Sequence, residues 1–190
     1  MKDVKDSEEQ KKVDEYLDVI ENRILAPIQN TEVRSYCTAT LLLLFAAIDG
    51  LGKLLHPNDT AGSNERIRGF LEYMGSDYGG HKKELLKLRN SLVHNAINVE
   101  SFLSHADSGT DQHLKKIGAA GFIYVNTMVM YKDVVSAFER FCAEIKGNVI
   151  TMKRSADRLE WRVDTPCIGP FGPNVAIPSP PPPVEFIYAK

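Results

Sequence analysis

The residues of this sequence that could do chemistry lie in one stretch, residues 85–95, which reads LLKLRNSLVHN. Its leucines recur every three or four positions, which predicts a helix with a buried face. Arg89 falls among those leucines on the helical wheel. A guanidinium cannot shed its charge, so a buried one needs a carboxylate, backbone carbonyls or a wet cleft. His94 adds a group that gains or loses a proton near neutral pH.

A partner for Arg89 is available in the most apolar segment of the chain, LLLLFAAIDGLGKLL. Asp49 is flanked on its own helical wheel by Leu42 and Phe45, so it too is a charge in an apolar surface. We therefore predict that Asp49 and Arg89 pair. The pair would be either a buried structural salt bridge, which is weak evidence for stability, or part of a functional site.

The opposite face of the helix that carries Arg89 has a polar stripe. Lys83, Lys87, Asn90 and His94 are four, three and four residues apart, so they share one side of a helix. One interpretation is a solvated face. The other is a track for a phosphate chain that passes a titratable group, because the helix dipole opposes lysines in the first turns. Arg89 and His94 are about 140° apart round an ideal helix, so either the arginine curls back or a second subunit completes the site.

The composition limits where and how such a site could act. The chain has 190 residues, which suffice for one domain with a core and an appendage. A net charge of -2 argues against a surface that binds nucleic acid throughout, so any such contact must be local. The polar start MKDVKDSEEQKK lacks the apolar run of a signal peptide. Three widely spaced cysteines indicate free thiols, and together these features predict a cytoplasmic protein.

The spacing of apolar residues predicts an all-α fold of four or five helices with a small irregular or hairpin insertion. The most apolar run, residues 36–48, is shorter than the roughly 20 residues that span a bilayer, so we interpret it as a helix buried nearly all round or serving a subunit interface. The segment GSDYGG is predicted to end the helix before it, and GFIYV to form a short strand. The expected helices cover 7–25 (ended by Pro27), 31–55 (capped by Thr31), 64–74, 81–95, and 127–146 (ended by Gly147).

The composition changes after the last predicted helix. Eight of the ten prolines lie beyond residue 165, including PSPPPP at 178–183, which favours polyproline II. We therefore predict a helical domain at 7–146 and a proline-rich C-terminal extension at 147–190. The extension would lie along the domain, remain mobile, or bind a proline-recognition module of a partner.

The stretch LRNSLVHN resembles the signature of HEPN domains, in which an arginine is followed by a polar residue and, a few positions later, a histidine. Here these residues are Arg89, Asn90 and His94. The setting strengthens the resemblance, because the motif follows a long apolar helix with an acidic residue and precedes an amphipathic helix. The resemblance covers roughly residues 7–146. It implies an up-and-down helical bundle, commonly a symmetric homodimer whose two motif helices face a shared cleft.

The resemblance also implies a function. Many HEPN proteins are metal-independent endoribonucleases, often bacterial toxins or antiviral effectors, whereas others only bind RNA or nucleotides. His94 would act as general acid or base, Arg89 would stabilise charge on the phosphorus oxygens, and Asn90 would orient the imidazole or hold a phosphate oxygen. Asp49 would support the site.

We thus expect RNA as a substrate or ligand, with Lys83 and Lys87 contacting it, and no metal or other cofactor. Expected protein partners are a second copy of the chain and an antitoxin or nucleotidyltransferase. The alternatives are a non-catalytic module that binds RNA, a nucleotide or a protein, and an interaction protein that recruits a partner through its C-terminal extension. No membrane association is expected.

Overall fold

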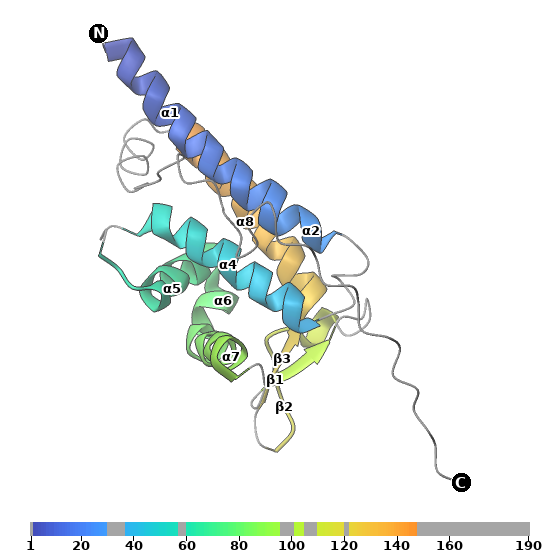
Figure 1. Ribbon diagram of the computed structural model, residues 1–190. Helices are drawn as coiled ribbons and strands as arrows, with labels where there is room; N and C mark the ends of the chain where they lie inside the picture. Colours follow the sequence, from blue (N-terminus) through green and yellow to red (C-terminus); the bar gives the residue numbers. More distant parts are fainter. Residues whose placement is uncertain are drawn as a thin grey trace, which may run out of the picture. The chain divides into compact units, whose positions relative to one another are not determined.

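The computed structural model describes residues 2–29, 37–56, 60–95, 101–104, 110–119 and 122–147. This part of the chain is mostly helical, in agreement with the predicted all-α class (Figure 1). All of it belongs to one compact unit, Met1–Leu159. The predicted cap at Thr31 and the proline-rich extension lie outside the described residues.

The first helical segment consists of α1 (Lys2–Val19), a π-helical turn η1 (Ile20–Leu25) and α2 (Ala26–Ile28). The prediction that Pro27 ends this helix is wrong, because the chain stays helical to Ile28. Pro27 follows directly on η1, and Leu25 and Ala26 before it keep helical backbone angles.

The central helix is α4 (Cys37–Leu55), which packs against η1, α5, α7 and α8 (Figure 1). Its length and composition would also suit a membrane span, but half of its most apolar stretch is buried within the protein. The helix thus has one face in the core but is not buried nearly all round, and the alternative of a subunit interface stays a prediction. The fully buried large side chains of α4 are Leu41, Leu44, Ile48, Leu51 and Leu54.

Three helices follow α4 in the chain: α5 (Ser63–Met74), α6 (Ser76–Gly80) and α7 (Lys82–Asn95). The prediction that GSDYGG ends the helix before it is confirmed, because α5 ends at Met74, and a further short helix, α6, forms within this segment. Gly75 separates α5 from α6 with a φ of 141°, a backbone conformation that side chains other than glycine rarely adopt. Gly52 brings α5 close to α4, since a Cβ at this position would lie 2.3 Å from the carbonyl oxygen of Arg66.

A small sheet lies between α7 and the last helix in sequence. It contains β1 (Ser101–Ser104), β2 (Lys116–Ile117) and β3 (Phe122–Asn126), in the order β1-β3-β2, with a short 3-10 helix η2 (Thr110–Gln112) before β2. A strand in GFIYV was predicted and is confirmed. The hairpin, however, is formed by β2 and β3, whereas β1 pairs in parallel with β3, with Ser101 opposite Ile123.

The last helix, α8 (Thr127–Gly147), has the predicted start and end. Its start has a local cause, because the Oδ1 atom of Asn126 accepts hydrogen bonds from the N–H groups of Met128 at 3.0 Å and Val129 at 3.2 Å.

Candidate functional site

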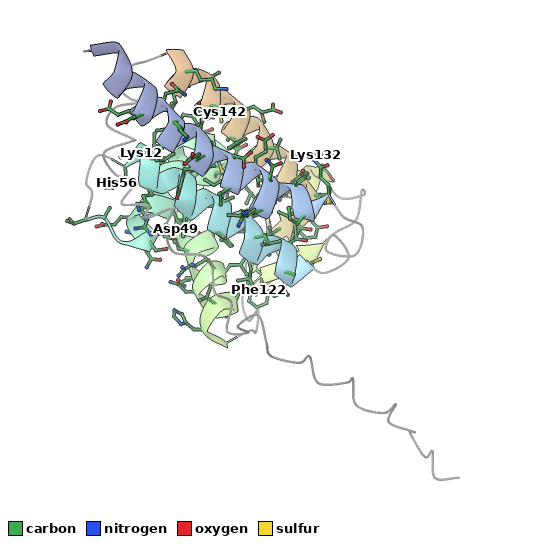
Figure 2. All side chains as sticks on the ribbon, turned by 45° about the horizontal axis from the view of Figure 1, so that its top comes forward. Lys12, Asp49, His56, Phe122, Lys132 and Cys142 are labelled. Atoms are coloured by element: carbon green, nitrogen blue, oxygen red, sulfur yellow. The ribbon has the colours of Figure 1, made fainter. Side chains whose placement is uncertain are left out.

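Asp49, in the C-terminal half of α4, is the acidic residue around which the candidate site forms (Figure 2). Its carboxylate binds Arg66 of α5 at two points, with Nε to Oδ1 at 2.7 Å and Nη2 to Oδ2 at 3.2 Å. The predicted direct pair between Asp49 and Arg89 is therefore wrong. The hydrogen bond to Asp49 raises the pKa of Arg66 above its usual value. Arg66 also donates through Nη1 to the carbonyl oxygen of Ala61 at 3.0 Å.

Ser63 connects this ion pair to α7. Its hydroxyl donates to Oδ2 of Asp49 at 2.8 Å and accepts from Nη2 of Arg89 at 3.2 Å. Arg89 in turn donates through Nη1 to Oδ1 of Asn90 at 3.0 Å. The side chains of Arg66, Asp49, Ser63, Arg89 and Asn90 thus form one hydrogen-bonded chain across α4, α5 and α7.

The position of Ser63 follows from how α5 begins. The carboxylate of Glu65 accepts the N–H of Gly62 at 3.1 Å, which is half of a capping box and fixes the start of the helix. Ser63 is then the first residue of α5. Because Gly52 allows α5 to approach α4 closely, this first turn of α5 lies beside Asp49.

Arg89 forms no ion pair in the part of the chain that the structure describes. Its hydrogen-bond partners there, Ser63 and Asn90, are both neutral, and Asp49 is already paired with Arg66. A guanidinium has five N–H donors, of which these bonds use two, so Arg89 retains donors for a ligand. Its side chain is half-buried, which weakens solvent screening. This arrangement favours an anionic ligand.

His94 lies in the last turn of α7 and is exposed, as is its neighbour Val93, with 48% of its surface accessible. Within the described residues, no hydrogen bond joins His94 to Arg89 or Asn90. The structure therefore unites Arg89, Asn90 and Asp49 in one network through Ser63 and leaves His94 outside it. The difference in burial agrees with the angle of about 140° expected between Arg89 and His94.

The predicted lysine stripe is also at the surface. Lys83 and Lys87 are both exposed on α7. Their neighbour Lys82 forms an ion pair with Glu72 of α5. The exposure of Lys83 and Lys87 thus agrees with the polar face of the helix that their spacing predicts.

The structure also contains a second polar cluster, which no sequence motif predicts. The hydroxyl of Tyr78 in α6 donates to Oδ2 of Asp133 in α8 at 2.7 Å and lies 2.9 Å from Nε2 of His113. The backbone N–H of Asn126 donates to Nδ1 of His113 at 3.0 Å, so the proton of the neutral imidazole is on Nε2 and points to Tyr78. Burial lowers the pKa of His113 to about 4 and raises that of Tyr78.

This second cluster joins α6, α8 and the segment before β2. Tyr78 is only 5% exposed, so its phenol is out of reach of a large substrate. The signal in the sequence is limited to a tyrosine in a glycine-rich segment and a histidine in a loop. We interpret the cluster as a structural connection between these elements.

Among the described residues, no group of three or more His, Cys, Asp or Glu side chains is arranged to hold a metal ion. Comparison of the chain with protein-family models, with curated proteins and with solved structures gives no match. The functional assignment must therefore be argued from the residues and their geometry.

Proposed function

We propose that this protein is a metal-independent endoribonuclease of the HEPN type, which acts in bacterial defence, a toxin–antitoxin pair or a stress response. One observation carries the proposal: Arg89 has a half-buried guanidinium that forms no ion pair with the described residues and uses only two of its five N–H donors on them, on the same helix as the exposed His94. A phosphodiester supplies the negative charge and the several acceptor oxygens that this guanidinium lacks.

The proposed reaction is cleavage of RNA by its own 2'-hydroxyl. The imidazole of His94 removes the proton of the 2'-hydroxyl, and the 2'-oxygen forms a bond to the adjacent phosphorus. The bond from phosphorus to the 5'-oxygen breaks, and that oxygen takes up a proton, leaving a 2',3'-cyclic phosphate and a 5'-hydroxyl. Arg89 stabilises the negative charge that accumulates on the phosphorus oxygens. Asn90 holds Arg89 through its amide oxygen.

A second copy of the chain would complete the site in this proposal. Arg89 and His94 point about 140° apart on one helix, so a single phosphodiester reaches both more easily if they come from different copies. A symmetric dimer with two α7 helices facing one cleft would place His94 of each copy near Arg89 of the other. The exposed side chain of Val93 would then be covered.

A non-catalytic module that binds RNA is the second candidate. It is favoured by the absence, within the described residues, of a hydrogen bond that orients His94. This candidate predicts that RNA binding survives His94→Ala and that no RNA is cut.

The test is incubation of labelled RNA with purified protein in EDTA. We expect the wild type to yield products that end in a 2',3'-cyclic phosphate. His94→Ala should lose about 10²–10⁴-fold in rate and Arg89→Ala about 10²–10³-fold. His81→Ala is the matched control, because this histidine lies just before the same helix and its side chain hydrogen-bonds only to the carbonyl oxygen of Asp77 among the described residues. It should cut RNA at the wild-type rate.

Two results would contradict the proposal. Cleavage by both His94→Ala and Arg89→Ala at the wild-type rate would show that the activity comes from elsewhere. No cleavage of any RNA by a correctly folded wild type would leave the binding module as the better account.

A further inference from the structure

Ser63 touches both the Asp49–Arg66 ion pair and Arg89, and the direction of its hydrogen bonds is fixed by chemistry. A guanidinium has no acceptor, so Arg89 can only donate to the Ser63 oxygen. The single hydroxyl proton of Ser63 is therefore free to point to Asp49, as its 2.8 Å distance indicates. The Ser63 hydroxyl thus accepts a hydrogen bond from the charged Arg89 and donates one to the charged Asp49.

Arg66 determines where this acceptor lies. It holds both carboxylate oxygens of Asp49 and is itself tied to the carbonyl oxygen of Ala61. The carboxylate is consequently neutralised by Arg66 of α5, and it is linked to Arg89 through the Ser63 hydroxyl. A direct Asp49–Arg89 pair would instead have used the N–H donors of Arg89 and cancelled its charge. The serine hydroxyl keeps the arginine in place without neutralising it.

We propose that Ser63 is a positioning residue that prepares Arg89 to bind one phosphodiester group of RNA. The inference rests on the proposed function in that the phosphodiester is taken to be that of RNA. Asp49 and Arg66 act through Ser63, and Arg89 alone of these residues touches the ligand.

Binding can be measured apart from cleavage with a 2'-O-methyl RNA oligonucleotide, which lacks the nucleophilic hydroxyl. Fluorescence anisotropy should show about tenfold weaker binding for Ser63→Ala, which corresponds to about 1.4 kcal/mol. Ser63→Thr retains the hydroxyl and should bind within about twofold of the wild type. Asn64→Ala is the matched control, because Asn64 is exposed in the same first turn of α5. Its affinity should be unchanged.

A second readout separates positioning from a general role of Ser63 in the fold. In the wild type and in Ser63→Thr, the hydrogen-bonded guanidinium N–H protons of Arg89 should exchange slowly with water in NMR spectra. In Ser63→Ala they should exchange faster, while the melting temperature stays within a few degrees of the wild type. A loss of stability alone would not release these protons at temperatures where the protein is folded.

The inference is overturned if Ser63→Ala binds the oligonucleotide as tightly as the wild type, or if Ser63→Thr is impaired as much as Ser63→Ala. It is also overturned if the wild type does not bind the oligonucleotide, or if the Arg89 protons behave alike in all variants. Failure of the proposed function looks different: the wild type would bind the oligonucleotide with the expected dependence on Ser63 and yet leave unmodified RNA intact.

Discussion

Gly52→Ala tests the close approach of α4 and α5 on which the network depends. A Cβ at Gly52 would lie 2.3 Å from the carbonyl oxygen of Arg66 and 2.6 Å from its carbonyl carbon, whereas ordinary contacts begin at 3.4 Å. The clashing atoms belong to the backbone of a helix, so they cannot rotate away. The two helices must separate by about 1 Å, since packed interiors have little free space.

The expected free-energy change combines two opposing effects. Alanine in place of glycine favours a helix by about 1 kcal/mol. Overpacking costs about 1–3 kcal/mol and occasionally more, and a clash with backbone atoms belongs at the upper end. We therefore expect Gly52→Ala to lower the free energy of unfolding by about 2 kcal/mol. The displaced residue is Arg66, so oligonucleotide binding should weaken as well.

Gly69→Ala is the matched control, because Gly69 lies within α5 and its added Cβ would meet only His56 Cδ2 at 3.7 Å. This variant should keep the helix-propensity gain and be more stable by about 0.5–1 kcal/mol. Urea unfolding followed by circular dichroism gives both values. If Gly52→Ala is as stable as Gly69→Ala, the two helices do not approach as closely as described, and the account of how Ser63 reaches Asp49 fails with it.

Three further predictions concern the remaining buried polar groups. Tyr78→Phe removes the hydroxyl that bonds to Asp133 and His113, and urea unfolding should show a loss of about 1–3 kcal/mol. Tyr73→Phe should be neutral or stabilising in the same assay, because the buried Tyr73 hydroxyl has no hydrogen-bond partner among the described residues. Burial holds the pKa of His113 at about 4 against 6.5 when unfolded, with Asp133 opposing and His81 reinforcing the shift. As the pH falls, His113 therefore takes up a proton in the unfolded chain before it does so in the folded protein. The contribution of neutral His113 to the free energy of unfolding is complete above pH 6.5 and should be lost as the pH falls towards 4. In His113→Gln, urea unfolding at the same pH values should not show this loss.

Sequence periodicity and local capping determined most of the helices. The limits of α8 were predicted from the apolar spacing and from Gly147, and the start at Thr127 has a local cause because Asn126 caps the helix from one residue away. The core position of α4 was predicted because its apolar residues cover nearly all of its circumference. Local patterns failed where a special backbone feature intervened, as with the π-helical turn before Pro27 and the positive φ of Gly75 before α6.

The candidate site was only partly determined by the sequence. The sequence identified Asp49 and Arg89 as charges that need partners, because each is a charged residue among apolar neighbours. It could not determine which charges meet, since that depends on the distance between helices that are far apart in the chain. Because Gly52 has no side chain, α4 and α5 lie close together. Asp49 therefore pairs with Arg66, and the Ser63 hydroxyl lies between Asp49 and Arg89. The pairing of β1 with β3 and the meeting of Tyr78 with His113 are non-local in the same way, so only the tertiary structure decided them.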